Sequence, residues 1–299
     1  MIRPVIAGID GSAESLAAAE WAAHEAVRRD RPLRLVHVWN WHPRQDGELA
    51  TAAARHLGRR ALRQAEERIG HVCPGVRLDD EQVEGPATTA LLRASEQADM
   101  LVLGSRGLSG LTGFLVGSVG LGVVARARRP VVLVRAREQA EDEPLPADDG
   151  SVSTRPGHHE VVLGIDLGDP CDQVIDFAFE AARTRGARLR AVHASQPPGP
   201  FVPGPGEVGI LEGPQRAEEW LGFMTATLEV WRDKYPDVQV TGTVTEGRAQ
   251  SVLVRASSGA DLVVVGRRIT GRPGLAHTGP VTHAAIHHVV CPVAVVPHE

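Results

Sequence analysis

The sequence contains two copies of one pattern, and this duplication limits the fold more than any other feature. The run Val5–Asp10 returns 156 residues later as Val161–Asp166, with nearly the same apolar order. The run Asp99–Gly104 returns 162 residues later as Asp261–Gly266. The second copy therefore carries about six additional residues, which we expect within the Pro- and Gly-rich stretch Pro197–Pro214. So long a period indicates duplicated domains rather than a solenoid, whose repeats span about 20 to 50 residues.

A chain of 299 residues is also long enough for two domains. Domains of about 150 residues are common, and each half can bury a core of its own. We place the first domain at residues 1–137 and the second at residues 159–299. Between them, residues 138–158 are acidic, contain proline and show no apolar periodicity, which is typical of a linker.

Each copy reads as an alternation of strands and helices. Short, nearly continuous apolar runs predict strands that are buried on both faces, and longer runs with apolar residues every three to four positions predict amphipathic helices. Ser12 is the expected N-cap of the first helix, and Asp169-Pro170 are the expected N-cap and first residue of its counterpart. The predicted strands of the first copy are 4–10, 33–39, 76–83, 100–104 and 130–135, and the predicted helices are 12–29, 48–69, 87–97 and 114–127.

This alternation predicts the fold class α/β, with two tandem, Rossmann-like, doubly wound domains. Five strands joined by right-handed helical crossovers form an open parallel sheet. The last strands, Val131–Val134 and Val293–Val296, are apolar and would lie at the edge of each sheet. Because exposed apolar edges favour pairing, we expect the two halves to form a pseudo-dimer within one chain.

The glycine-rich segment Gly104–Ser118 is the strongest functional signal. It contains Gly104, Gly107 and Gly117 directly after a buried strand. Glycines let backbone N–H groups approach an anion closely, and a helix N-terminus adds partial positive charge. The spacing is neither Gly-x-Gly-x-x-Gly nor a P-loop, and the single lysine, Lys234, lies elsewhere. A phosphate held here would therefore rely on backbone amides, Ser118 and Arg106.

Asp10 ends the first predicted strand, next to the expected position of Gly104. Ligands of doubly wound sheets bind outside the carboxyl ends of the strands, at the point where the strand order reverses. An aspartate at this point can accept hydrogen bonds from a ribose or a base. It can equally be a helix cap or a turn former, and the glycines can be simple turn formers, so both interpretations stay open on the sequence alone.

Asp10, His37-Val38 and the Gly104-x2-Gly107-x9-Gly117-Ser118 spacing resemble the ATP-binding pattern of the universal stress protein family. The two-copy layout is similar to the tandem members found in actinobacteria. The resemblance implies an ATP-binding regulator of stress response or dormancy, with Mg²⁺ or Mn²⁺ carried on the phosphates, and a homodimer of chains. It implies this nucleotide-binding set: Gly8, Ile9 and Asp10 at adenine and ribose, Val38 near the adenine, Gly104, Arg106 and Gly107 at ribose and phosphate, and Gly117, Ser118 and Val119 at the phosphate chain.

The second copy departs from this pattern at two positions. Ile269 stands where the first copy has Gly107, and Pro280 stands where it has Ser118. Proline has no backbone N–H, and a β-branched side chain takes space near the backbone. We therefore expect a lost or much weaker second site. Its candidate residues are Asp166, Ala194, Gly266, Arg268 and Gly279.

Composition excludes several other classes. The net charge of −5 disfavours a general nucleic-acid binder, and no apolar run approaches the length of a membrane helix. Three cysteines without a Cys-x-x-Cys motif indicate reduced thiols and a cytoplasmic protein. His283 and His287 have the spacing of a zinc pair, but a solvated helix face explains them better.

Two classes of function remain. The preferred one is a regulator with little or no catalysis, in which bound nucleotide biases the arrangement of domains. The alternative is an ATP-hydrolysing or adenylating enzyme on the same fold. The sequence offers no activated nucleophile and no lysine near the expected phosphates, so we assign no catalytic residue. The downstream protein partner is not encoded in any recognisable motif.

Overall fold

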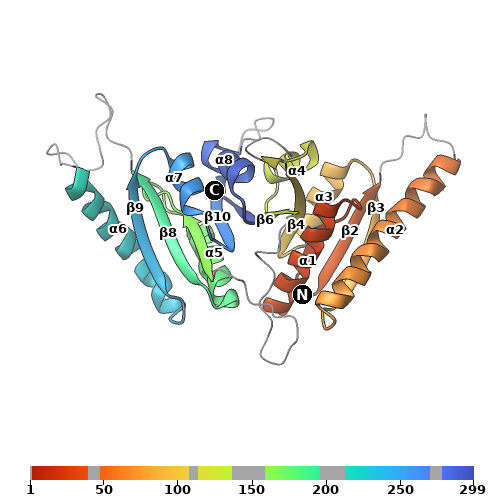
Figure 1. The fold of residues 1–299 in the computed structure, drawn as a ribbon, viewed down its shortest axis with the longest axis horizontal. Helices are drawn as coiled ribbons and strands as arrows, with labels where there is room; N and C mark the ends of the chain where they lie inside the picture. Colours follow the sequence, from red (N-terminus) through yellow and green to blue (C-terminus); the bar gives the residue numbers. More distant parts are fainter. Residues whose placement is uncertain (1, 40–47, 108–113, 137–158, 196–212, 270–277) are drawn as a thin grey trace.

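A computed structural model describes residues 2–39, 48–107, 114–136, 159–195, 213–269 and 278–299. Its strands form one eleven-stranded sheet with two similar halves (Figure 1). The first half contains β1 (Val5–Gly8), α1 (Ala13–Arg28), β2 (Leu33–Trp39), α2 (Glu48–Val72), β3 (Leu78–Glu84), α3 (Ala87–Glu96), β4 (Met100–Gly107), β5 (Phe114–Leu115), α4 (Ser118–Val124) and β6 (Val131–Arg135). The second contains β7 (Glu160–Gly164), α5 (Asp172–Arg185), β8 (Arg188–Ser195), α6 (Gly213–Lys234), β9 (Val240–Glu246), α7 (Ala249–Ala256), β10 (Leu262–Arg268), α8 (Pro280–His288) and β11 (Val293–His298).

The strand order confirms both the doubly wound fold and the internal pseudo-dimer. The order is β3-β2-β1-β4-β6 in the first half and β9-β8-β7-β10-β11 in the second. The main-path strands of each half are parallel, and β6 pairs antiparallel with β11 through Val131↔Val295, Val132↔Ala294 and Leu133↔Val293. Each half thus supplies the edge partner that the other half's last strand requires.

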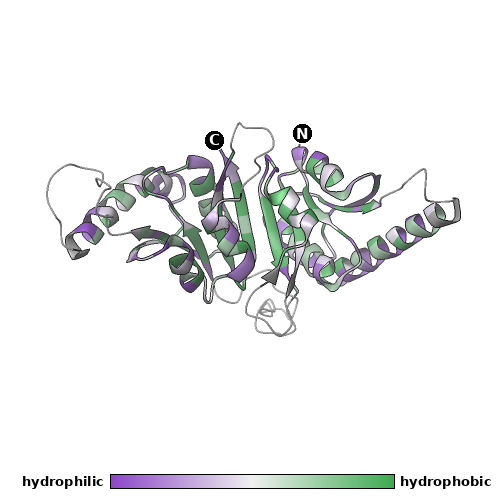
Figure 2. Cartoon of the chain, turned by 90° about the horizontal axis from the view of Figure 1, so that it is seen from above, coloured by the Kyte–Doolittle hydropathy of each residue, from purple (hydrophilic) through white to green (hydrophobic). Residues whose placement is uncertain are grey.

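Helices cover both faces of this sheet. Helices α1, α2, α5 and α6 pack on one face, and α3, α4, α7 and α8 pack on the other. Each face has one apolar cluster that includes residues of both halves, so neither core stops at the β6–β11 seam. Figure 2 shows hydrophobic central strands between the helical layers, with α2 and α6 extending to the two ends of the molecule.

The start of α1 follows from three polar residues. The Asp10 carboxylate accepts hydrogen bonds from Ser12 N (2.9 Å) and Ser12 Oγ (2.5 Å). Ser12 Oγ in turn accepts a hydrogen bond from Ser15 N at 3.2 Å, which confirms Ser12 as the N-cap. Gly11 has a φ of +84°, a conformation that side chains disfavour, and this allows the sharp turn between β1 and the helix.

Two predicted helix starts are wrong. Phe114 and Leu115 form the short strand β5, which pairs with Gly107 and Arg106 of an extended β4. Helix α4 begins only at Ser118, because Gly117 is extended, with φ −60° and ψ 159°. A local apolar pattern cannot distinguish a helix start from a strand that finds a partner in the sheet.

The start of α5 also differs from the prediction. Its N-cap is Cys171 rather than Asp169, because a turn in which Asp166 accepts a hydrogen bond from Gly168 N (3.0 Å) displaces the helix start along the chain. The predicted linker 138–158 lies outside the described residues, as does most of the stretch expected to hold the extra residues of the second copy.

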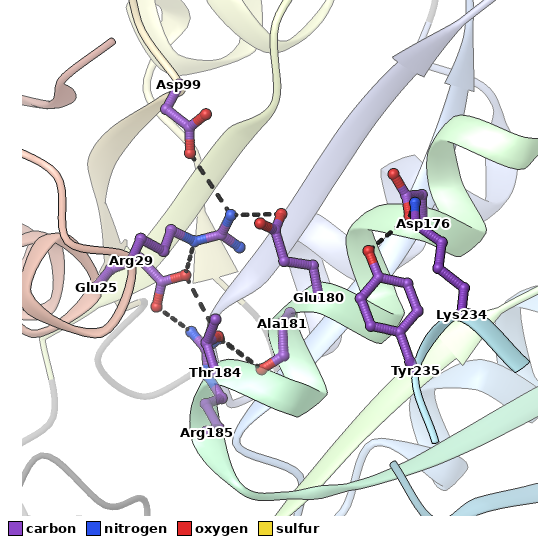
Figure 3. Close-up of polar contacts among 10 residues, drawn as sticks. All are labelled: Glu25, Arg29, Asp99, Asp176, Glu180, Ala181, Thr184, Arg185, Lys234 and Tyr235. Atoms are coloured by element: carbon purple, nitrogen blue, oxygen red, sulfur yellow. Dashed lines mark hydrogen bonds and ion pairs between the residues drawn. The ribbon is translucent and has the colours of Figure 1, made fainter. Parts of the chain in front are cut away.

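A buried ionic cluster joins α1 to α5 across the seam (Figure 3). Glu25 of α1 bonds Arg29 at 2.5 Å and Arg185 of α5 at 2.6 Å, and all three side chains are almost fully buried. Arg29 also reaches Glu180 of α5 at 2.8 Å and Asp99 at 3.5 Å. The arginines hold the pKa of Glu25 down at about 2, although burial alone would raise it.

This cluster is symmetric in its arginines and asymmetric in its acids. Arg29 and Arg185 are equivalent in the two copies, and each stacks on an aromatic ring of the other half: Arg29 on Phe177, and Arg185 on Trp21. The position equivalent to Glu25, however, is Ala181. Glu25 therefore bonds one arginine from each half and has no acidic counterpart, which makes the two halves complementary rather than identical.

Candidate functional site

The expected site of the first copy lies where β1 and β4 end side by side. These two strands are neighbours and parallel, with Val5↔Met100 and Ala7↔Val102 in register. Helices leave β1 and β4 toward opposite faces of the sheet, so the carboxyl edge opens between them. Gly8 ends β1 and Ile9 follows it, Gly104 lies in β4, and Ser118 begins α4.

Asp10 performs a structural role within this edge. One of its carboxylate oxygens organises the α1 start through Ser12, and the residue is exposed. His37 supports the same loop, because its Nδ1 lies 2.8 Å from the Ile9 carbonyl oxygen, which can only accept. The turn-forming interpretation of Asp10 is thus confirmed. This structural role is compatible with ligand binding, because the turn holds the Asp10 carboxylate in a fixed position where β1 ends.

The glycines of the predicted site serve different purposes. A Cβ at Gly104 would overlap the Glu14 carbonyl group and lie 2.7 Å from Ser15 N, so this glycine lets β4 and α1 pack closely. A Cβ at Gly8 would lie 2.6 Å from the Leu103 side chain. Gly117 is different, because no atom of the described residues lies within 4 Å of its Cβ position and its φ suits any residue. The described structure itself gives no reason for a glycine at 117.

The remaining predicted residues are distributed around this edge. Val38 is half-buried and packs against the α3–α4 face of the sheet, as does Val119. Ser118 is exposed at the first position of α4. The backbones of Arg106 and Gly107 belong to β4, but the Arg106 side chain lies outside the described part of the structure, as do residues 108–113 between β4 and β5.

Substitutions at Gly104 and Gly117 are expected to separate packing from ligand contact. Gly104→Ala forces a methyl group against helix backbone, so we expect the free energy of unfolding to fall by about 1–3 kcal/mol. Gly117→Ala meets open space, so we expect unfolding to change by less than about 1 kcal/mol. Urea unfolding followed by circular dichroism measures both. Equal stability losses in the two variants would contradict this assignment.

The second copy contains a cavity of about 730 Å³ at the equivalent edge, within the size range of small-molecule sites. Its lining comes from both faces of the sheet and from the ends of β7, β8, β10 and β11. It contains all five residues expected for a second site: Asp166, Ala194, Gly266, Arg268 and Gly279. Arg268 forms an exposed ion pair with Asp169 at the rim.

Sequence reasoning missed two side chains of this cavity. Trp220 of α6 lies with its ring centroid 4.7 Å from that of His193, and both line the cavity. Burial lowers the pKa of His193, which favours the neutral imidazole. His298 of β11 overhangs Gly266, since a Cβ there would lie 2.9 Å from His298 Nε2. The equivalent residue in the first copy is Ala136, so comparing the two copies at this position could have signalled His298.

The two departures of the second copy have clear structural consequences. Pro280 is the first residue of α8 and presents no N–H there. Ile269 N donates to the His298 carbonyl oxygen at 2.6 Å, so its N–H is already used by the sheet. Ile269 also does not have a positive φ. The backbone at Ile269 is therefore not strained, and the clear difference from the first copy is the N–H and the hydroxyl that Ser118 has and Pro280 lacks.

Most other groups considered in the sequence do not line the cavity of the second copy, and Cys171 is the exception among the described residues. Lys234 ends α6, where it pairs with the exposed Asp176 at 2.6 Å (Figure 3). His283 and His288 are exposed on α8, whereas His287 is half-buried, so only part of the histidine cluster lies on a solvated face. The ring centroids of His283 and His287 lie 4.4 Å apart. Cys73 is a buried thiol, and Cys171 is half-buried and forms no disulfide. Among the described residues, no group of three or more His, Cys, Asp or Glu is arranged to hold a metal, and no helix is both long and apolar enough to cross a bilayer.

The sheet consists of two doubly wound halves joined through their last strands, and in each half the strand order reverses beside a turn that contains an aspartate. This arrangement defines a tandem α/β protein with one candidate ligand-binding edge in each half. The chain belongs to the universal stress protein family, whose model matches residues 1–135 and 158–297. It is 34% identical to a universal stress protein of Mycobacterium tuberculosis over 97% of this chain and 96% of that protein. A second universal stress protein of the same bacterium is 31% identical, over 97% of this chain and 94% of that protein.

A solved structure supports the arrangement of the two halves. The crystal structure of a universal stress protein from Archaeoglobus fulgidus is similar with a TM-score of 0.73, over 99% of this chain and 98% of that chain. The two sequences are only 17% identical, so this likeness concerns the fold alone. The family and the tandem α/β architecture expected from the sequence are confirmed.

Proposed function

We propose that the chain is a nucleotide-dependent regulator that binds ATP at the carboxyl edge of β1 and β4. The observation that carries the proposal is Gly117. Its neighbours leave room for a side chain and its φ requires no glycine, yet it directly precedes Ser118 at the α4 start. A phosphate that approaches the backbone at this point explains the glycine, because any Cβ would reduce that approach.

The nucleoside end of the proposed ligand would lie against β1 and β2. Asp10, exposed and held by its own turn, would accept hydrogen bonds from ribose hydroxyls, and the apolar Val38 would pack near the base. The phosphate chain would lie toward Arg106, Gly107, Gly117 and Ser118. A divalent ion, Mg²⁺ or Mn²⁺, would accompany the phosphates rather than occupy a ligand set of the protein itself.

We propose a weaker role for the cavity of the second copy. Asp166, Ala194 and Gly266 offer the nucleoside contacts of the first copy, and the cavity is already open. Its phosphate end lacks two donors of the first copy, the N–H and the hydroxyl of Ser118, because Pro280 has neither. Two missing hydrogen bonds to a charged group, at about 1.5–3 kcal/mol each, correspond to an affinity lower by about a hundredfold or more.

Calorimetric titration of the full chain with ATP and Mg²⁺ tests this proposal. We expect close to one tight site per chain. Asp10→Ala should remove it, whereas Asp166→Ala, the matched change in the second copy, should leave it intact. Asp10→Asn is a useful third variant, because the amide oxygen can still accept from Ser12 N and so preserve the turn.

Three results would contradict the proposal. Unchanged ATP affinity in Asp10→Ala with normal circular dichroism would show that this edge is not the site. Two sites of equal affinity would contradict the inequality of the copies. Sustained turnover of ATP that Asp10→Ala abolishes would favour the alternative, an ATP-hydrolysing or adenylating enzyme.

The proposal also includes a cytoplasmic location, a homodimer of chains and domain limits at 1–137 and 159–299. Because β6 and β11 already occupy each other's edges, such a homodimer would use another surface.

A further inference from the structure

Two buried arginines cross the seam in opposite directions. Arg267 of β10 extends from the second half and donates to the carbonyl oxygens of Ala125, at 3.0 Å, and Ala127, where α4 ends in the first half. Arg135 of β6 extends from the first half and donates to the carbonyl oxygens of Ile286, at 3.0 Å, and Val289, at 2.6 Å, where α8 ends. Both arginine residues are only 5% exposed.

These arginines do not occupy equivalent positions, although they perform equivalent tasks. Ser105 is the counterpart of Arg267, and Pro297 is the counterpart of Arg135. Yet Ala127 and Val289, which accept from them, are counterparts of each other. Ser105 itself accepts a hydrogen bond from Arg135 at 2.7 Å. Each half thus caps a helix C-terminus of the other half: β10 of the second half caps α4, and β6 of the first half caps α8.

The cap supplied by the other half matters most for α4, because this helix has only seven residues. The last carbonyl groups of a helix have no partners within it and carry partial negative charge, so a buried guanidinium stabilises them. So short a helix is marginal by itself and depends on such contacts. The other end of α4 carries Gly117 and Ser118, the proposed phosphate contacts.

We propose that Arg267 is a positioning residue of the first nucleotide site, supplied by the second half. By holding the C-terminus of α4, it sets where Gly117 and Ser118 lie relative to Asp10. Arg267 directly follows Gly266, which lines the second cavity. The end of β10 therefore lines the second site and also holds α4, the helix that begins at the proposed phosphate contacts of the first site. The phosphate part of this inference rests on the proposed function, whereas the positioning of α4 does not.

The full chain with Arg267→Met tests the proposal through two ligands. Adenosine engages only the nucleoside end, whereas ATP with Mg²⁺ also requires the α4 start. We expect ATP affinity to fall about tenfold or more while adenosine affinity changes less than about twofold. Arg267→Lys keeps the charge and should recover part of the loss. Equal changes in both affinities, or no change in either, would overturn the proposed selective effect on phosphate binding.

Arg190→Met is the matched control. Arg190 donates to the Ala256 carbonyl oxygen at the end of α7, but it lies within the same half and away from the first site. We expect it to leave the ratio of ATP to adenosine affinity unchanged. A fall in that ratio as large as with Arg267→Met would contradict a specific role for Arg267.

Hydrogen exchange of the free protein provides a readout without any ligand. Arg267→Met should raise amide exchange in α4 and leave α2, which packs on the opposite face of the sheet, unchanged. Unaltered protection of α4 would overturn the positioning role. If the parent chain binds no ATP, the proposed function fails, and hydrogen exchange still decides whether Arg267 holds α4.

Discussion

Glu25→Ala is expected to lower the free energy of unfolding by about 3–5 kcal/mol. The substitution removes the carboxylate that bonds both Arg29 and Arg185, and it leaves Arg185 buried without that partner while Arg29 keeps Glu180. Losing one partner of a buried ion pair costs far more than an exposed pair contributes, because the remaining charge stays desolvated. Alanine is compatible with this helix position, since Ala181 occupies it in the second half. Urea unfolding at pH 7 measures the loss.

Arg77→Ala is the matched control for this prediction. It removes an exposed ion pair of the same chemistry, between Arg77 and Asp30 at 3.2 Å, and should cost less than about 1 kcal/mol. A loss below about 1 kcal/mol for Glu25→Ala as well would show that the seam does not depend on its ionic cluster. The apolar β6–β11 pairing would then be sufficient to hold the halves together.

Acidification is expected to destabilise the chain in two overlapping steps. His24, buried beside Arg28, has a pKa lowered from 6.5 to about 4, first by burial and then by the arginine. The unfolded chain therefore binds this proton more readily, and stability falls by about 3 kcal/mol as the pH drops from 6.5 to 4. Glu25, lowered from 4.5 to about 2, adds a comparable loss between pH 4.5 and pH 2.

His24→Gln isolates the first step, because glutamine does not titrate. Urea unfolding at pH 7 and pH 4.5 should show a smaller difference for this variant than for the parent chain. A residual difference is expected, since burial also lowers the pKa of His193. His56→Gln, at an exposed position of α2, should behave like the parent. An equal pH effect in His24→Gln and the parent would contradict the assignment to His24.

Much of the fold could be predicted because its signals are local. Apolar runs marked the strands, Ser12 marked the start of α1, and the repeated landmarks established two copies of one α/β pattern. The apolar last strands also predicted their own pairing, since each copy offered the same unprotected edge. The edge that carries Asp10 and Gly104 followed from strand order, because parallel strands end on the same side of a sheet.

The roles of individual site residues were less accessible. Gly104 looked like a phosphate glycine, but its Cβ position is filled by the backbone of α1, whereas Gly117 is free of any such demand. The two glycines look alike in the sequence and differ only in what surrounds them. Phe114 and Leu115 fitted a helix until β4 provided a strand partner.

The sequence by itself thus determined the family, the doubly wound fold, the duplication and the edge where a ligand would bind, because each depends on patterns within a short stretch or on repetition between stretches. Only the tertiary structure decided how the two copies hold each other at the seam. Glu25 serves arginines from both halves, and Arg267 and Arg135 cap helices of opposite halves. These contacts join residues about 140 to 160 positions apart, and no local pattern encodes them, because they arise from packing at the seam.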